Sequence, residues 1–185
     1  MESKKTALVV VDIQNDYFPG GKMTLHNMEQ ATENAAKLLH SFRQKGLPRF
    51  LVRHEAASPE LGFMLPGSEG AELHEKVKPQ EGDVIITKKQ ISSFNGTELD
   101  AKLKEAGVEN LVVCGAMSHM CIDGTVRAAA DLGYKCTLIE DACATRDVQY
   151  KDKVVPAEDV QAAYLAALGF AYAEIQNADD YLSKH

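Results

Sequence analysis

The feature that most constrains the fold is a repeated alternation of short apolar runs with longer amphipathic stretches. Residues 7–11 form a continuous apolar run that ends at Asp12, which is typical of a strand buried on both faces of a parallel sheet. Similar runs follow at residues 49–52, 84–87, 111–114, 136–139 and 171–175. The chain therefore offers a series of short strands, each separated from the next by a longer connection.

The connections carry the period of helices. Between residues 28 and 44 the apolar side chains recur at spacings of three and four, which predicts an amphipathic helix that Gly46 stops. Further helical stretches are predicted at residues 97–106, 121–132 and 157–168, the last two followed by Gly133 and Gly169, with a short helix at 177–185. Alternating strands and helices imply right-handed crossovers, so we expect one α/β domain spanning residues 1–185, with an open parallel sheet covered on both faces.

Composition and charge exclude several classes of protein. The 185 residues carry a formal net charge of -7 with scattered lysines, which argues against nucleic acid or an anionic membrane as the main partner. No apolar run approaches the roughly 20 residues of a membrane span, and residues 1–5 lead directly into the first strand, so we expect a cytoplasmic protein. The four cysteines lack CxxC spacing, which suggests neither a zinc knuckle nor a disulfide framework.

Three polar residues lie at the carboxyl ends of predicted strands, where such a sheet binds ligands. Asp12 ends the first strand, Lys88 follows the third, and Cys121 opens the helical stretch after the fourth. A carboxylate that takes the thiol proton and an ammonium that favours the thiolate form a coherent site for acyl transfer. The positive end of the helix is expected to lower the pKa of the Cys121 thiol.

Each of these residues also has a simpler interpretation. Cys121 can be a small apolar residue at a turn, Asp12 a loop cap, and Lys88 half of a solvated pair with Lys89. The occurrence of all three in one fold favours a catalytic triad. Two other functions stay open: a thiol redox enzyme that oxidises Cys121, although no resolving cysteine is evident, and a non-catalytic small-molecule-binding domain, although no phosphate-binding loop is present.

Three segments together resemble the isochorismatase-like cysteine hydrolases, the superfamily that includes nicotinamidases and carbamoylsarcosine amidases. They are residues 9–18 (VVVDIQNDYF), residues 87–94 (TKKQISSF) with Thr97 and Leu99, and residues 115–129 (GAMSHMCIDGTVRAA). The resemblance implies a three-layer, Rossmann-like sandwich with a six-stranded parallel sheet. It also implies Asp12, Lys88 and Cys121 as the catalytic residues of an enzyme that forms a thioester at Cys121.

The resemblance extends to the turn before the cysteine. It implies a cis peptide bond between Ala116 and Met117 and an oxyanion hole made by the backbone N–H groups of Met117 and Cys121. Members that cleave a vinyl ether lack the nucleophilic cysteine, so its presence favours attack on a small amide, imide or carbamoyl substrate. A homo-oligomer, dimer or tetramer, is also implied.

The metal motif of nicotinamidases is not matched. Those enzymes carry an aspartate and histidines just after the second strand, whereas this chain reads VRHEA at residues 52–56, so we expect no metal and no other cofactor. His54 and Tyr17 are candidate substrate contacts. His119 lies too close in sequence to Cys121 to face it as a dyad, and residues 55–82 are expected to form an active-site flap or an oligomer contact. Asp141 is expected to order a loop, and the other three cysteines are interpreted as structural.

Overall fold

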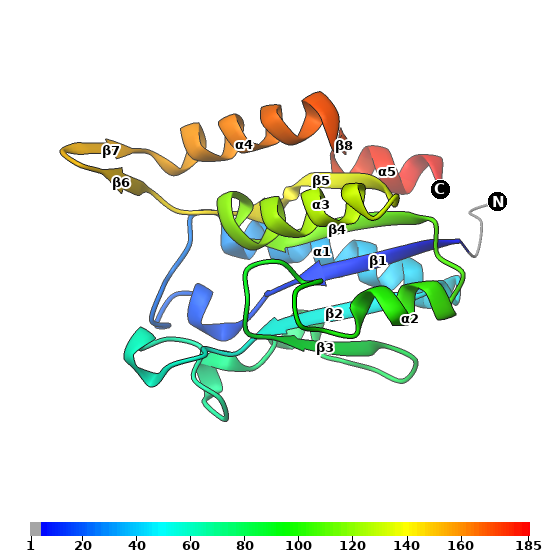
Figure 1. Ribbon diagram of the computed structural model, residues 1–185, viewed down its shortest axis with the longest axis horizontal. Coiled ribbons are helices and arrows are strands. Elements are labelled where there is room, and N and C mark those ends of the chain that lie inside the picture. The colour runs from blue at the N-terminus through cyan, green and yellow to red at the C-terminus, as the bar shows by residue number, and fades with distance from the viewer. Residues whose placement is uncertain (1–4) are drawn as a thin grey trace.

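Six parallel strands form one sheet in the order β3-β2-β1-β4-β5-β8. This confirms the predicted α/β fold with a six-stranded parallel sheet in the computed structural model, which describes residues 5–185 (Figure 1). Residues 1–4, on which part of the expected N-terminus rested, lie outside the described residues. The strands are β1 (Thr6–Val11), β2 (Arg49–His54), β3 (Val84–Lys88), β4 (Asn110–Ala116), β5 (Lys135–Ala144) and β8 (Ala173–Gln176).

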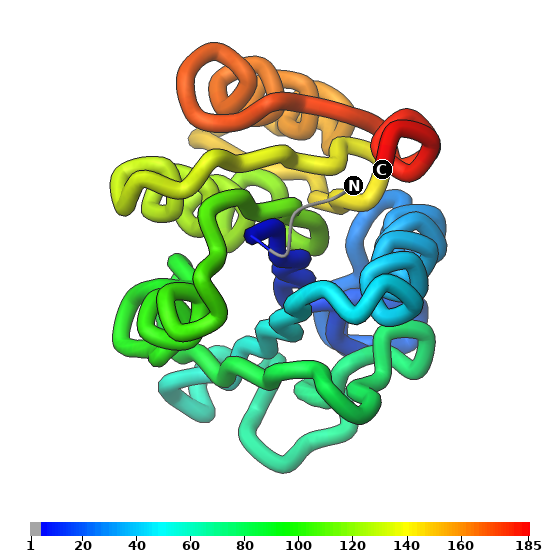
Figure 2. Tube along the Cα trace, turned by 90° about the vertical axis from the view of Figure 1, so that its right-hand side faces the viewer, coloured from blue at the N-terminus to red at the C-terminus, as the bar shows by residue number. Residues whose placement is uncertain are grey.

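Helices cover both faces of the sheet, as Figure 2 shows along the strands. The core on one face contains residues of α1 and α5, and the core on the other contains residues of α2, α3 and α4. Alternate residues of β1 point to opposite cores, so residues 7–11 are all fully buried and explain the continuous apolar run. The helices are α1 (Met28–Gln44), α2 (Leu99–Glu105), α3 (Asp123–Asp131), α4 (Ala157–Ala171) and α5 (Ala178–Lys184).

Two details near the C-terminus differ from the prediction. Helix α4 continues past Gly169 to Ala171, and the last strand begins at Ala173 rather than at 171. A Cβ atom at Gly169 would lie 2.9 Å from Ile175 Cγ1, so this glycine lets the helix pack closely on β8 instead of ending the helix. The structure also contains an antiparallel hairpin that was not predicted, formed by β6 (Val148–Tyr150) and β7 (Lys153–Val155), which projects from the body in Figure 1.

The stretch between β2 and β3 is irregular but anchored. It holds three short 3-10 turns at Pro59–Leu61, Glu69–Ala71 and Glu75–Val77. Met64, Ala71 and Val77 are buried in the core on the α1 face, and the Met64 N–H donates a 2.5 Å hydrogen bond to Asp16 Oδ2. Its role as a flap or an oligomer contact stays a prediction. Within residues 5–185, none of the helices is both long and apolar enough to cross a bilayer.

Gly115 lies where β4 passes close to the backbone of β1. Its φ is +126°, and a Cβ atom there would lie 1.9 Å from the Val11 carbonyl oxygen. We expect Gly115→Ala to lower the free energy of unfolding by more than about 3 kcal/mol, because both the backbone conformation and the strand contact must be distorted. Urea denaturation measures this loss.

The matched control is Gly107→Ala. Gly107 also has a positive φ, +66°, but nothing lies within 4 Å of the position that a Cβ atom would take there. We expect Gly107→Ala to cost only about 1 kcal/mol, the strain of a left-handed alanine. Equal losses in the two variants would show that the strand contact at Gly115 contributes nothing.

Candidate active site

The structure brings Asp12, Lys88 and Cys121 together beyond the carboxyl ends of the strands. Lys88 Nζ lies 2.8 Å from Asp12 Oδ2 and 3.2 Å from Cys121 Sγ. The three residues are 0%, 1% and 5% exposed, so their polar groups interact almost without solvent screening. Lys88 ends β3, two strands away from β1, and only a long side chain can span β2 to reach Asp12.

The backbone around Asp12 is unusual. Asp12 directly follows β1 with φ +52°, a left-handed conformation that aspartate and asparagine tolerate better than other non-glycine residues. Its N–H donates a 2.9 Å hydrogen bond to the Val52 carbonyl of the neighbouring strand. This turn redirects the chain directly after β1, and the carboxylate comes within reach of the Lys88 ammonium.

Cys121 lies in a π-helical turn, Ser118–Ile122, that connects β4 to α3. The helix proper begins at Asp123, two residues later than the sequence predicted. The peptide bond between Ala116 and Met117 is cis. The Met117 carbonyl accepts hydrogen bonds from the Met120 and Ile122 N–H groups, at 3.0 and 3.2 Å. The oxyanion hole at the Met117 and Cys121 N–H groups stays a prediction.

The electrostatic state of Cys121 corrects the sequence prediction. Burial, followed by the neighbouring Asp12 carboxylate, raises the pKa of the thiol to about 12, although Lys88 acts in the opposite direction. The expected lowering by the helix end is therefore wrong, because desolvation and a like charge at close range outweigh it. At neutral pH the resting thiol is uncharged, and forming the thiolate requires a base.

Lys88 keeps its positive charge in this environment. Burial alone lowers the pKa of an ammonium, but the Asp12 carboxylate and the Cys121 sulfur, which both accept hydrogen bonds from it, outweigh burial and raise the pKa of Lys88. The Gln90 carbonyl also accepts a 3.0 Å hydrogen bond from Lys88 Nζ. The site therefore holds a permanent cation next to the thiol.

The two candidate substrate contacts lie next to the triad. His54 ends β2 directly opposite Lys88 in the strand register, and its Nδ1 lies 3.2 Å from Lys88 Nζ. Tyr17 is 2% exposed, and burial, followed by the nearby Asp12 carboxylate and Cys121 sulfur, raises the pKa of its phenol well above the usual value. Both substrate roles stay predictions.

Gln14 is a site residue to which the sequence assigned no role. Its fully buried side chain accepts from the His54 N–H at 2.8 Å and donates to the His54 carbonyl, also at 2.8 Å. The same amide donates to the Ala71 carbonyl at 2.7 Å. The only sequence signal was a polar residue three positions after the end of a buried strand, between the apolar Ile13 and the polar Asn15.

The remaining residues singled out from the sequence lie outside the triad. His119 Nδ1 lies 2.6 Å from Thr145 Oγ1, as expected for a histidine that does not pair with Cys121. Asp141 belongs to β5, and its carboxylate accepts from the Ala178 N–H at the start of α5 and from Asn34, so it joins two helices rather than ordering a loop. The other three cysteines are buried and unbridged: Cys114, Cys136 and Cys143.

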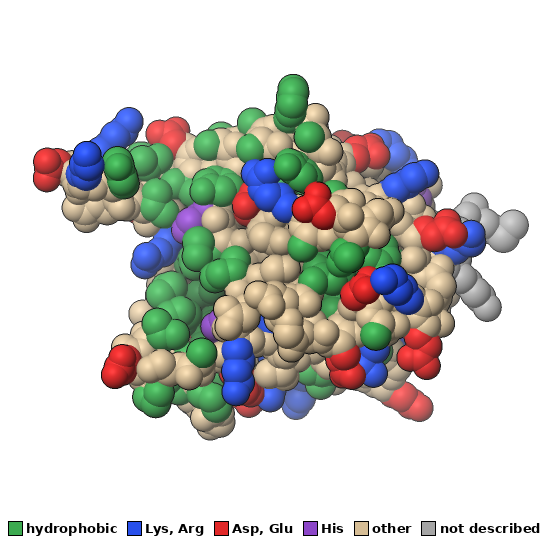
Figure 3. All heavy atoms as spheres, viewed as in Figure 1, with side chains coloured by type: hydrophobic (Ala, Val, Ile, Leu, Met, Phe, Trp, Pro, Cys, Tyr) green, Lys and Arg blue, Asp and Glu red, His purple; other side chains and the backbone are tan. Residues whose placement is uncertain are grey.

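The surface is hollowed on the side where the strands end. In Figure 3 the hollow lies on the left, beneath the projecting hairpin, and hydrophobic and histidine side chains gather on its walls.

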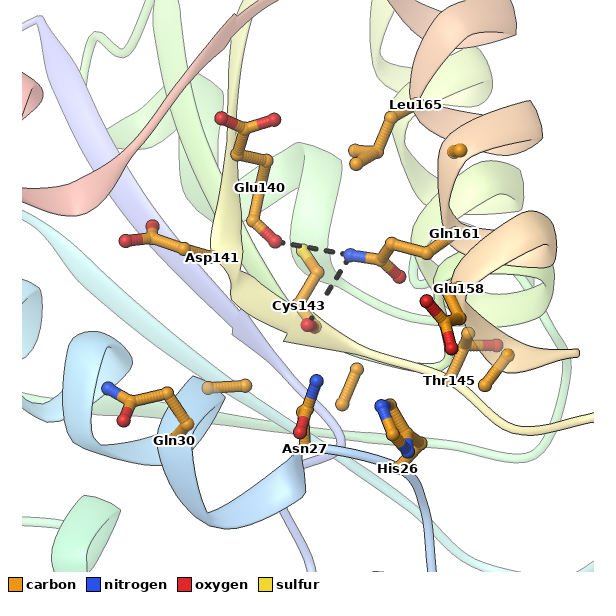
Figure 4. A pocket seen from close by; sticks show the side chains of 14 residues that line it. His26, Asn27, Gln30, Glu140, Asp141, Cys143, Thr145, Glu158, Gln161 and Leu165 are labelled. Atoms are coloured by element: carbon orange, nitrogen blue, oxygen red, sulfur yellow. Dashed lines mark hydrogen bonds between the residues drawn. The ribbon is translucent and has the colours of Figure 1, made fainter.

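A separate cavity of about 550 Å³ lies between α1, β5 and α4, and the triad residues are not part of its lining (Figure 4). There Gln161 Nε2 donates to the Glu140 and Cys143 carbonyls of β5. Among residues 5–185, histidine, cysteine and acidic side chains form no group of three that could hold a metal ion.

Comparison with known proteins gives consistent matches over most of the chain. A family model described as the isochorismatase domain matches residues 6–162. An uncharacterized isochorismatase family protein of Bacillus subtilis, YddQ, is 52% identical over 177 residues, covering 96% of this chain and 98% of that protein.

Solved structures agree with this match. The crystal structure of a putative isochorismatase hydrolase from Oleispira antarctica superposes with a TM-score of 0.94 at 48% identity, over 99% of this chain and 98% of that one. The N-carbamoylsarcosine amidase of Thermoplasma acidophilum gives a TM-score of 0.80 at 26% identity, over 95% of this chain and 97% of that one.

Proposed function

The chain belongs to the isochorismatase family of hydrolases, and on that premise we propose that it cleaves a C–N bond of a small amide, imide or carbamoyl substrate through a thioester at Cys121. The observation that carries the proposal is the contact of one buried ammonium with both a carboxylate and a thiol, Lys88 with Asp12 and Cys121. An amidase among the similar structures supports the same class of reaction.

The first half of the reaction forms the thioester. Asp12 takes the proton of the Cys121 thiol as the sulfur attacks the substrate carbonyl carbon, and Lys88 stabilises the developing thiolate. The negative charge on the carbonyl oxygen is met by the Met117 and Cys121 N–H groups. The protonated Asp12 then gives its proton to the leaving nitrogen, and the C–N bond breaks.

The second half restores the enzyme. A water molecule loses a proton to Asp12 and attacks the thioester carbon, and the C–S bond breaks. The sulfur takes the proton back from Asp12, so the acid product leaves a neutral thiol. Starting and ending as a thiol agrees with a Cys121 pKa of about 12. The same pKa gives less support to the thiol redox alternative, because peroxide reacts with a thiolate.

The substrate is expected to enter the hollow beside the hairpin, with Tyr17 and His54 as its polar contacts. This reaction requires no metal and no other cofactor.

The proposal also includes a homo-oligomer, either a dimer or a tetramer. Large apolar side chains exposed on α4 and on the hairpin support an interface between copies of the chain: Phe170 is 91% exposed and Tyr150 is 72% exposed.

The test is trapping of the thioester. The protein is mixed with a panel of small amides, imides and carbamoyl compounds, quenched in acid within a single turnover, and digested for mass spectrometry. We expect an acyl or carbamoyl adduct on the peptide that contains Cys121, together with released ammonia or amine. Turnover of a panel member with an adduct on any other residue, or turnover that leaves Cys121 unmodified at every quench time, would contradict the mechanism.

A further inference from the structure

The Lys88 ammonium has more acceptors around it than it has protons. Four atoms lie within hydrogen-bond distance of Nζ: Asp12 Oδ2 at 2.8 Å, the Gln90 carbonyl at 3.0 Å, His54 Nδ1 at 3.2 Å and Cys121 Sγ at 3.2 Å. An ammonium has three N–H groups, so at most three of these acceptors can receive a full hydrogen bond at one time.

The two longer contacts are the ones that compete. The sulfur of a neutral thiol is a weak acceptor, whereas an imidazole nitrogen is a strong one, so the third N–H turns to His54 while Cys121 is protonated. A thiolate carries a negative charge, so the Lys88 ammonium gains a Coulomb attraction to it that the neutral imidazole does not offer. The same N–H therefore turns to the sulfur once the thiolate has formed.

His54 is held where this exchange requires it. The Gln14 side chain hydrogen-bonds to both the N–H and the carbonyl of His54. The pairing of β2 with β3 also places His54 directly opposite Lys88. Burial, followed by the charge of Lys88, lowers the pKa of His54, and Asp12, Glu55 and the Gln90 carbonyl act in the opposite direction. The imidazole is thus neutral at neutral pH, and an Nδ1 that accepts leaves the proton on Nε2.

We propose that His54 is a positioning residue that shares one N–H of Lys88 with Cys121, holding it while the thiol is neutral and releasing it as the thiolate forms. The proposal rests on the proposed function, because it concerns the step in which that thiolate appears. It gives His54 a task within the reaction besides contact with a substrate.

The test measures alkylation of Cys121 by iodoacetamide, which needs no substrate. Rates are read by mass spectrometry from the peptide that contains Cys121, at a mildly alkaline pH. In His54→Leu the neutral thiol state loses an acceptor for Lys88, so we expect alkylation to become about fivefold faster through a larger thiolate fraction. In His54→Asn, where the side-chain oxygen can replace Nδ1 as acceptor, the rate is expected to return close to that of the unchanged protein.

A second measurement uses the unchanged protein. The nitrogen chemical shifts of the His54 imidazole are expected to show an unprotonated Nδ1 and a protonated Nε2 at neutral pH. A protonated Nδ1, a His54→Leu rate equal to or below that of the unchanged protein, or equal rates in the Leu and Asn variants would each overturn the proposal. Failure of the proposed hydrolysis would appear instead as missing acyl adducts, and it leaves these ratios unaffected.

Discussion

Cys121→Ser is expected to reduce amide hydrolysis at least about a thousandfold, with little change in stability. A serine hydroxyl is far less acidic than a thiol, and the buried site already raises the pKa of the thiol to about 12. Asp12 can remove a thiol proton as the sulfur attacks, whereas a hydroxyl gives up its proton to a carboxylate far less readily. Steady-state hydrolysis of the panel member that the protein turns over fastest measures the loss.

Cys136→Ala is the matched control for this prediction. Cys136 is also buried and its thiol pKa is raised to about 11 by burial, but it lies in β5, where its hydrogen-bond partner is the Tyr134 carbonyl at 3.8 Å rather than a triad residue. We expect this variant to keep its hydrolysis rate after correction for the folded fraction. Undiminished hydrolysis by Cys121→Ser would exclude the sulfur as the attacking atom.

Asp12→Asn is expected to lose both activity and stability. Asparagine tolerates the positive φ at this position, so the backbone is retained while the general base is removed. Hydrolysis should fall about a thousandfold. The Lys88 ammonium, 1% exposed, loses its charged partner, and breaking a buried ion pair from one side costs about 3–5 kcal/mol.

The double variant separates the two effects. Asp12→Asn with Lys88→Met leaves no uncompensated buried charge, so we expect its free energy of unfolding to exceed that of either single variant while its activity stays lost. Urea denaturation and hydrolysis are measured on all four proteins of the cycle. If the two single losses of stability simply add in the double variant, the buried ion pair is not coupled as the structure indicates.

The sequence predicted the sheet and the triad for the same physical reason. Apolar runs buried on both faces indicate parallel strands, and the carboxyl ends of parallel strands meet at one edge. Asp12 and Cys121 come after such runs, and Lys88 ends the partly exposed strand β3, so chain order alone predicted that all three lie at the same end of the sheet. The resemblance of the three segments to one superfamily led to the same residues and the same fold.

Other features depended on contacts that the sequence does not reveal. Gln14 fixes the His54 backbone from 40 positions away, and the sequence around Gln14 does not indicate which residue it contacts. The strands β6 and β7 have three residues each, too few to show a period. Gly169 has the appearance of a helix stop, but it is required by the close packing of α4 on Ile175.

What the sequence by itself determined is which chemical groups are present and at which edge of the sheet they lie, because strand periodicity and chain order fix both. Only the tertiary structure decided their electrostatic state. The pKa of Cys121 depends on how completely water is removed and how close Asp12 and Lys88 come, and these distances are set by packing between segments far apart in the chain. The sequence predicted a reactive thiolate at Cys121, whereas in the packed structure Cys121 is a neutral thiol next to a carboxylate base, an ammonium and a histidine.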